Sequence, residues 1–403
     1  MKSIRDVYKI GKGPSSSHTM GPERAARLFL SKYPDAETYR VVLYGSLSKT
    51  GRGHGTDRVL YEVLGRERTE VVFSEETPHS LPHPNTLDFF ACREGKPYAT
   101  MRVASIGGGD IRIEGQDAPE EQDEVYPENS FAEIAQFCRW RYISLSEYVE
   151  LNEGPGIWDF LAEVWQTMKQ AVADGLAAEG TLPGGLNVER KAKRLYAQSK
   201  ENERPQVREL RIVCAYAFAV SEQNADNGTI VTAPTCGSAG VMPALVYALR
   251  HEMFIGDRAI REAFLASAAV GFIAKHNASI AGAEVGCQGE IGVASAMAAA
   301  FVADARGYRS RVTENAAEVA LEHHLGITCD PVQGYVQIPC IERNAMGAIK
   351  AYNAAVITSG TDPYSQRVSL DAAIAAMAET GREMSCKFKE TSLGGLAVSM
   401  VAC

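Results

Sequence analysis

The sequence predicts an α+β N-terminal domain followed by a large all-α C-terminal domain. Segments rich in β-branched and aromatic residues, which suit a pleated strand, are concentrated in the first part of the chain. From about residue 143 onward they nearly vanish. Alanine-rich segments with apolar residues three and four positions apart replace them, which is the periodicity of helices. We therefore expect a small α+β domain over residues 1–150 and an all-α domain over residues 151–403.

The N-terminal region contains short predicted elements separated by turns. Residues 38–46 (TYRVVLYGS) are typical of a strand, and residues 57–64 fit a short helix with Asp57 near its N-cap. The glycine run at 107–109 indicates a turn. Further strands are expected at 70–73, 97–106 and 111–113.

The C-terminal region is predicted to be a set of packed helices. Several of its segments are apolar on nearly every side, as buried helices are. The predicted helices span residues 156–178, 207–222, 242–253, 257–275, 289–306, 313–324, 341–357 and 370–383.

The composition limits the classes of partner and compartment. Hydrophobic residues make up 45% and charged residues 23% of the 403, which is typical of a soluble globular protein. The net charge of −9 argues against nucleic-acid or anionic-membrane partners, because both favour basic surfaces. The apolar runs at 263–274 and 291–303 are shorter than the about 18–20 residues that span a bilayer. The N-terminus lacks an apolar signal-peptide core, so we expect a cytoplasmic protein.

Four glycine-rich polar stretches interrupt the predicted elements. Such stretches let the backbone approach a ligand closely and offer free N–H groups. Ordinary turns rarely combine this much Ser, His, Thr and Cys, so we expect ligand contacts in them. The stretches are GKGPSSSHTMGP (11–22), GSLSKTGRGHGTD (45–57), APTCGSAG (233–240) and SIAGAEVGCQGEIG (279–292).

The chain has nine cysteines, which in a reducing compartment are mostly core residues, metal ligands or catalytic groups. Cys287, Cys329 and Cys340 lie beside Gly, Pro or Asp at element boundaries, unlike an inert core cysteine within a helix. Their spacing is that of neither a zinc finger nor a ferredoxin, so spacing alone leaves core and metal roles open. Cysteines in apolar or helical surroundings are interpreted as core: Cys92, Cys138 and Cys214. No role is assigned to Cys236 or Cys386.

Eight segments, in order along the chain, resemble motifs of the bacterial iron–sulfur L-serine dehydratases, also called L-serine ammonia-lyases. They are GPSSSHTMGP (13–22), YGSLSKTGRGHGTD (44–57), HPNT (83–86), SIGGGDI (105–111), LPGGL (182–186), APTCGSAGVMPA (233–244), AGAEVGCQGEIGVASAMAAA (281–300) and GITCDPVQGYVQIPCIERNAMGAIKAYNAA (326–355). The resemblance runs from Ile4 to Cys403, and it is to the single-chain form with a β and an α domain.

The resemblance implies a [4Fe–4S] cluster. The three cluster ligands of the family match Cys287, Cys329 and Cys340, which leaves one iron without a protein ligand. An open coordination position distinguishes a catalytic metal site from a closed structural one. In some members a C-terminal cysteine folds back onto that open iron, and Cys403 matches its position.

The implied reaction is elimination of water from L-serine, the expected small-molecule partner, to give pyruvate and ammonia. The open iron acts as a Lewis acid on the hydroxyl, and a base removes the Cα proton. Histidine suits the base because its pKa lies near neutrality. We expect His54 to be the base, with His18 as the second candidate, and Thr56 and Asp57 to orient His54 or the substrate amine. The expected substrate-binding residues are Ser15, Ser16, Ser17, His83 and Asn85. The family also implies a homodimer.

Three other interpretations remain open at the level of sequence. A pyridoxal-phosphate dehydratase catalyses the same reaction through a Schiff-base lysine, typically in Ser-x-Lys-x-Arg-Gly. Residues 48–53 (SKTGRG) come close to that pattern but place Lys49 one position early. A non-catalytic amino-acid sensor is the second alternative. The third is the same chemistry on L-cysteine or L-threonine.

Overall fold

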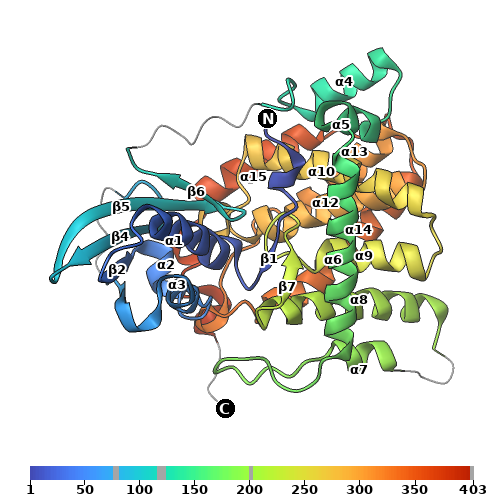
Figure 1. Ribbon diagram of the computed structural model, residues 1–403. Helices are drawn as coiled ribbons and strands as arrows, with labels where there is room; N and C mark the ends of the chain where they lie inside the picture. The colour runs from blue at the N-terminus through green and yellow to red at the C-terminus, as the bar shows by residue number, and fades with distance from the viewer. Residues whose placement is uncertain (76–80, 116–123, 199–202, 400–403) are drawn as a thin grey trace.

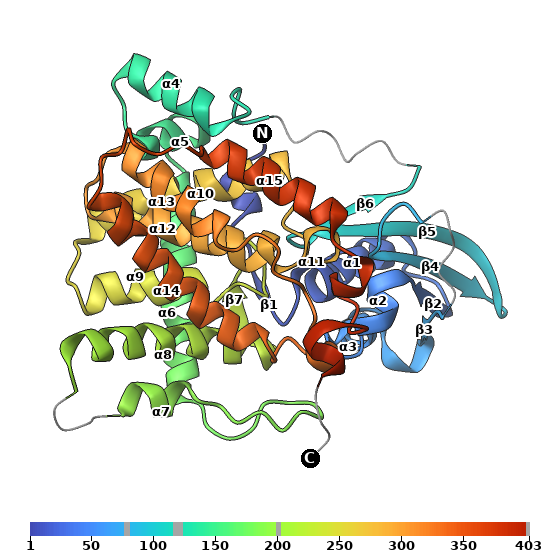
Figure 2. The same ribbon diagram turned by 180° about the vertical axis from the view of Figure 1, so that it is seen from behind.

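The computed structural model describes residues 1–75, 81–115, 124–198 and 203–399. A small domain built on a β-sheet lies beside a larger helical domain, which confirms the predicted fold class (Figure 1). In the view from behind, the segment that follows α15 (Leu370–Glu383) runs along the boundary between the two domains (Figure 2). Across the described ranges, no helix combines the length and the apolar character needed to cross a bilayer.

Within the described residues, five strands form the sheet of the small domain in the order β3-β2-β4-β5-β6. β2 pairs with β3 in parallel, and the other neighbours pair antiparallel. The strands are β2 (Thr38–Leu43), β3 (Thr69–Phe73), β4 (Thr86–Arg93), β5 (Lys96–Gly107) and β6 (Asp110–Ile113). The four predicted strands are confirmed, and β4 is an addition.

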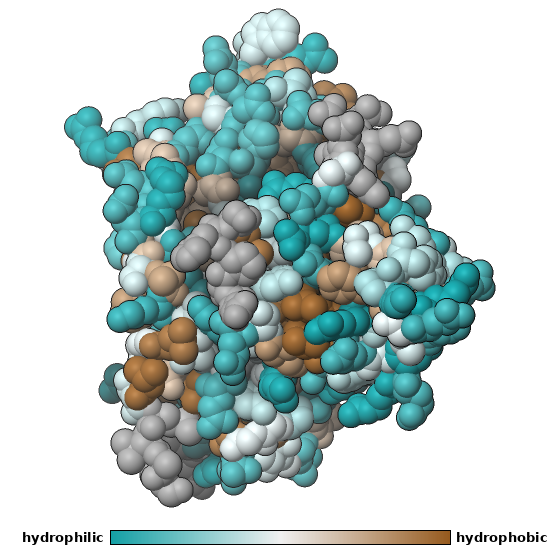
Figure 3. Space-filling view, turned by 90° about the vertical axis from the view of Figure 1, so that its left-hand side faces the viewer, coloured by the Kyte–Doolittle hydropathy of each residue, from teal (hydrophilic) through white to brown (hydrophobic). Residues whose placement is uncertain are grey.

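Two helices cover one face of this sheet. α1 (Gly21–Lys32) begins with a proline in its first turn, which suits a helix start. α3 (Thr56–Leu64) has Asp57 in its first turn, as expected. Apolar side chains of both helices pack on the sheet, with Phe29 and Leu60 against Phe89 and its neighbours. The surface of the molecule on the side of the small domain is largely hydrophilic, and small hydrophobic patches lie among the hydrophilic residues (Figure 3).

The helical domain is arranged around α12 (Val293–Ala305), whose alanine-rich sequence leaves twelve of its residues buried. Small side chains let α10 (Asp257–Asn277), α13 (Ser310–Glu322) and α14 (Cys340–Ser359) approach α12 closely. The eight predicted helices are confirmed, although residues 288–292 form a π-helical turn before α12. The larger helices besides α12 and α15 are α4 (Phe131–Arg141), α5 (Leu145–Glu153), α6 (Ile157–Ala177), α8 (Pro205–Ala225), α9 (Val241–His251), α10 (Asp257–Asn277), α13 (Ser310–Glu322) and α14 (Cys340–Ser359). Three shorter helices are α2 (Gly45–Thr50), α7 (Ala192–Ala197) and α11 (Gly282–Val285).

The start of the chain packs with the helical domain rather than with the sheet. Ile4, Val7 and Tyr8 are buried in the helical core, and β1 (Ile10–Lys12) pairs with β7 (Thr229–Val231). Ile113 packs against the core of the sheet, whereas Val125 and Tyr126 belong to the helical core, as do residues of α4 and α5. The domain boundary at residue 150 stays a prediction.

An ion network connects the small domain to α10. The Asp110 carboxylate lies 2.5 Å from Lys9 Nζ and 2.6 Å from Lys275 Nζ. Burial alone would raise the pKa of the Asp110 carboxyl, but Lys275 and Lys9 lower it below its usual value. The network therefore stabilises the fold while Asp110 is ionised, and this contribution is lost as the pH falls through its pKa.

We expect Asp110→Asn to lower the free energy of unfolding by about 3 kcal/mol, because it leaves two partly buried ammonium groups without a counter-charge. Urea denaturation at neutral pH measures the effect. Glu23→Gln is the control, since it removes only the exposed pair with Arg27 and is expected to cost less than about 0.5 kcal/mol. Equal effects of the two substitutions would contradict the role of the network.

Candidate functional site

The first of two histidine loops is a π-helical turn, Ser16–Met20, that leads directly into α1. Ser15 caps this turn, because its Oγ accepts the N–H of His18 at 3.1 Å. The Ser15 N–H in turn donates to Thr19 Oγ1 at 3.3 Å. These local bonds bury His18 completely and direct it into the protein.

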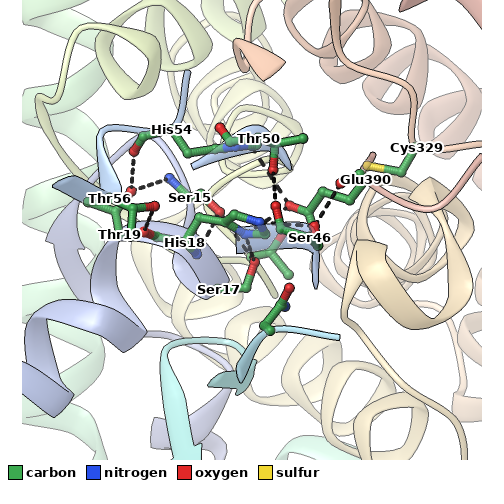
Figure 4. Close-up of polar contacts among 12 residues, drawn as sticks. Ser15, Ser17, His18, Thr19, Ser46, Thr50, His54, Thr56, Cys329 and Glu390 are labelled. Atoms are coloured by element: carbon green, nitrogen blue, oxygen red, sulfur yellow. Dashed lines mark hydrogen bonds and ion pairs between the residues drawn. The ribbon is translucent and has the colours of Figure 1, made fainter. Parts of the chain in front are cut away.

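The second loop carries His54 between α2 and α3. The two loops bind each other through threonine hydroxyls. Thr19 Oγ1 donates to the carbonyl of His54 at 2.8 Å, and Thr56 Oγ1 donates to the carbonyl of His18 at 2.6 Å. The imidazole centroids consequently lie 4.5 Å apart (Figure 4).

Hydrogen-bond partners distinguish the two imidazoles. Ser46 Oγ donates to the carbonyl of Glu390 at 2.7 Å, so it accepts from His18 Nε2–H at 3.1 Å. His18 Nδ1 accepts from Ser17 Oγ at 2.9 Å, and both ring nitrogens of His18 are therefore engaged. His54 Nδ1–H donates to the carbonyl of Thr50 at 2.9 Å, which leaves the lone pair on Nε2. His54 lines a small cavity and is the imidazole able to accept a proton there.

Burial keeps both imidazoles neutral. It lowers the pKa of His54 to about 4, and it lowers that of His18 well below the usual value, with a further contribution from His54. A neutral imidazole is the form that a general base requires.

The three predicted cluster cysteines line the same small cavity as His54. Each is buried and each comes from a different segment. Cys287 precedes the π-helical turn 288–292, Cys329 follows α13, and Cys340 is the first residue of α14. The sulfurs of Cys287 and Cys329 and a carboxylate oxygen of Glu290 all lie within 4.8 Å of one another.

The surroundings of these cysteines fit an iron–sulfur cluster. Thiolates are the usual ligands of such clusters. Gly282 provides room beside them, because a Cβ there would lie 3.1 Å from Cys329 Sγ and 2.8 Å from Glu290 Oε2. Burial alone would lower the pKa of the Arg343 guanidinium, but Cys287 and Cys340 raise it. Arg343 therefore offsets negative charge on the sulfurs. Burial also raises the pKa of the Cys340 thiol, and a cationic metal centre stabilises the thiolate instead.

Glu390 connects the cysteines to the histidines. Its N–H donates to the carbonyl of Cys329 at 2.6 Å, next to a bond from the Cys329 N–H to the carbonyl of Phe388 at 2.7 Å. Its Oε1 lies 3.3 Å from His18 Nδ1 and 3.8 Å from His54 Nε2. In Figure 4 Glu390 lies between Cys329 on one side and His18 and Ser46 on the other. Burial, followed by Glu290 and Cys287, raises the pKa of the Glu390 carboxyl.

The backbone of Glu390 is unusual as well. Its φ of 56° is in the left-handed region, which costs a non-glycine residue about 1–2 kcal/mol. Such conformations are retained where the surrounding structure fixes a functional side chain. Glu390 completes a cavity that also contains Ser15, His54 and the three cysteines.

Comparison with known proteins identifies the family of the chain. The model of the family described as serine dehydratase beta chain matches residues 3–72, and that of serine dehydratase alpha chain matches residues 123–397. The chain belongs to the serine dehydratase family. An L-serine dehydratase of Streptomyces coelicolor is 40% identical, with 100% of this chain and 99% of that protein covered. The L-serine dehydratase TdcG of Escherichia coli is 39% identical, with all of both chains covered.

The alignment to the Streptomyces protein extends over 455 positions, more than the 403 residues of this chain. That relative therefore carries segments that this serine dehydratase lacks. A more distant L-serine dehydratase, from Helicobacter pylori, is 35% identical and covers 99% of both chains.

In this serine dehydratase most of the predicted site residues lie together. Ser15, Ser17, His18, His54 and Thr56 form one hydrogen-bonded group, and Ser16 is buried in the same turn. The side chain of Asp57 is not brought to that group by any contact among the described residues. It is half-exposed, and its carboxylate accepts the N–H of Arg58 at 2.9 Å.

The HPN segment lies next to His18 rather than in the cysteine cavity. The carbonyl of Pro84 accepts the N–H of Ser46, whose hydroxyl binds His18. His83 Nε2 lies 2.8 Å from Glu284 Oε1. The side-chain amide of Asn85 is fully buried and has no hydrogen-bond partner among the described residues, while its backbone N–H donates to His83 Nδ1 at 3.0 Å. Cys403 lies outside the described residues.

Two site residues were missed by sequence reasoning. Glu290 lies in the GCQGEIG segment, in which the sequence predicts a role only for Cys287. Glu390 lies in KETSLGG (389–395), a polar glycine-containing stretch near the C-terminus of the same kind as the four stretches singled out. That composition was the available signal for Glu390.

Proposed function

We propose that this serine dehydratase converts L-serine to pyruvate and ammonia with a [4Fe–4S] cluster held by Cys287, Cys329 and Cys340. The observation that carries the proposal is the single cavity lined by all three cysteines and by His54. The L-serine dehydratases that align with this chain over its full length support the substrate.

The residues of the chain supply the base and its orientation. A bound cluster with one iron free of protein ligands supplies a Lewis acid that weakens the C–O bond of the serine hydroxyl. His54 Nε2 accepts the Cα proton, and the Thr50 carbonyl on Nδ1–H stabilises the resulting imidazolium. The electrons of the C–H bond form the Cα–Cβ double bond while hydroxide leaves Cβ. The aminoacrylate product becomes an imine and hydrolyses to pyruvate and ammonia.

The other loop residues hold this geometry. Thr19 and Thr56 fix the two histidine loops to each other, and Ser46 and Ser17 hold the His18 ring in place. Ser15 lines the cavity and offers a hydroxyl to the substrate carboxylate. We also propose Ser16, His83 and Asn85 as outer parts of the substrate site, and Cys403 as a ligand of the open iron when substrate is absent.

One experiment tests the proposal directly. Protein purified without oxygen is assayed for iron, sulfide and pyruvate release from L-serine. About four iron atoms per chain together with turnover support the proposal. A full cluster without turnover favours the amino-acid sensor. Faster turnover of L-cysteine or L-threonine than of L-serine reassigns the substrate.

The pyridoxal-phosphate alternative is disfavoured by the position of Lys49. This residue lies on α2 with its side chain exposed to solvent. A Schiff-base lysine needs an apolar or cationic environment to lower its pKa, and an exposed ammonium lacks one.

We further propose that the protein acts in the cytoplasm as a homodimer. A cluster with an open iron requires a reducing compartment. Exposed apolar side chains on α14, Met346, Val356 and Ile357, offer a surface for a second copy. Light scattering of the anaerobic protein measures the mass, and a monomer at micromolar concentration contradicts the dimer.

The lowered pKa of His54 predicts the acid limb of the pH profile. His54 must be neutral to accept a proton, so activity is lost as pH falls through its pKa of about 4. We expect kcat at saturating L-serine to remain level from pH 8 to about pH 5.5, with no loss near the usual histidine pKa of about 6.5. Initial rates at constant ionic strength measure the profile. A tenfold decrease between pH 7 and pH 5.5, with the cluster intact, contradicts the assignment.

A further inference from the structure

Glu390 offers an unused hydrogen-bond acceptor to the cavity. The residue is 4% exposed, and its Oε2 has no hydrogen-bond partner among the described residues. Oε1 of the same carboxyl group faces both histidines, at 3.3 Å from His18 Nδ1 and 3.8 Å from His54 Nε2. A buried carboxyl oxygen without a partner is costly unless a ligand or water completes it.

The cavity favours a cationic ligand group at this oxygen. Of the described residues that line it, none is Lys or Arg, and the carboxyl groups are those of Glu290 and Glu390. Both carboxylate oxygens of Glu290 already face other groups of the protein. Its Oε1 accepts the Thr235 hydroxyl at 2.7 Å, and its Oε2 lies 4.0 Å and 3.9 Å from the sulfurs of Cys287 and Cys329. Glu390 Oε2 is therefore the acceptor left for a substrate.

We propose that Glu390 binds the α-ammonium group of the substrate. The inference rests on the proposed function and deepens it, because it explains why the substrate is an α-amino acid. An ammonium group has three N–H donors, and one of them completes the Glu390 carboxyl group. Burial raises the pKa of that carboxyl, and the positive charge of the bound ammonium offsets this and stabilises the ionised form. The Cα atom is bonded directly to that nitrogen. Since Glu390 also faces His54 Nε2, the Cα–H bond lies close to the base.

The matched ligands are L-serine and 3-hydroxypropionate, which is the same molecule without the ammonium group. For Glu390→Gln we expect a KM for L-serine at least about tenfold higher, the usual size of a lost charged hydrogen bond. The Ki of 3-hydroxypropionate is expected to change less than threefold. Anaerobic calorimetry of both ligands gives a second measurement that does not depend on turnover.

Glu222→Gln is the control. Glu222 is also buried, and its Oε2 has no hydrogen-bond partner in the described part of the chain, but its Oε1 accepts the N–H of Lys191 and it does not line the cavity. We expect no change in the ratio of the two affinities. If Glu390→Gln fails to fold or to hold iron, Glu390→Asp is tested instead, because aspartate keeps the carboxylate on a side chain that is one methylene shorter. It is expected to weaken L-serine binding and not 3-hydroxypropionate binding.

The outcomes separate the two proposals. Equal weakening of both ligands, or of neither, shows that Glu390 does not bind the ammonium group and overturns the inference, while wild-type turnover leaves the proposed function standing. A wild-type protein that forms no pyruvate contradicts the proposed function. The calorimetric comparison then still decides the role of Glu390.

Discussion

Cys340→Ala is expected to lose the cluster and with it all measurable pyruvate formation, a decrease of at least about a thousandfold. The three cysteines come from separate segments, so removal of one leaves two thiols and the Glu290 carboxylate around the cavity. Iron and sulfide content, the visible absorbance of the cluster and the pyruvate assay on anaerobic protein measure the result.

Cys214→Ala is the matched control for that substitution. Cys214 is a half-buried cysteine on α8, outside the cavity. We expect it to retain full iron content and activity within twofold. A Cys340→Ala protein with a full complement of iron would show that another group holds the cluster.

His54→Gln is expected to lower kcat by about 10²–10⁴-fold, the usual contribution of a general base. A glutamine amide keeps a donor for the Thr50 carbonyl but has no basic nitrogen for the Cα proton. Because the cysteines are not changed, iron content is expected to match the wild type. Steady-state kinetics with L-serine separate the loss in kcat from any change in KM.

His324→Gln controls for the removal of a buried histidine. His324 is 1% exposed, donates from Nδ1 to the carbonyl of Ala320 at 2.7 Å, and lies outside the cavity. Its pKa, like that of His54, is lowered to about 4 by burial. Activity within threefold is expected. If His18→Gln abolishes turnover while His54→Gln retains it, the base is His18.

The helices and the cysteine site could be predicted because their signals are local. The helical segments carry three- and four-residue periodicity along one stretch of chain, and the cysteine segments carry long contiguous motifs. Strand β4 lacks such a signal. Asp88, an unfavourable strand residue, is the third residue of β4 and forms a bidentate pair with Arg102 at 2.7 and 2.8 Å. That pairing is formed between strands and is invisible to a strand pattern.

The roles within the site depend on contacts that no local pattern contains. Sequence alone favours His54 over His18 as the base, and this stays a prediction; the contact that bears on it, from His54 Nδ1–H to the Thr50 carbonyl, is visible only in the structure. Asp57 was grouped with His54 by its closeness in sequence, yet the first turn of α3 directs its carboxylate to the N–H of Arg58. Glu390 is not predicted because two of the groups that its carboxyl faces, His18 and His54, come from the opposite end of the chain.

The bond between Ser46 and Glu390 closes a loop of 344 residues. Contacts of such sequence separation form late in folding, because the entropy of closing the loop must be overcome before they contribute. During synthesis on a ribosome, the histidine loops are made first, and Glu390 is made only after almost the whole chain. A nascent or shortened polypeptide that lacks this last segment thus holds the histidines without Glu390. If Glu390 binds substrate as proposed, we expect detachment of that segment from an otherwise folded molecule to inactivate it without global unfolding.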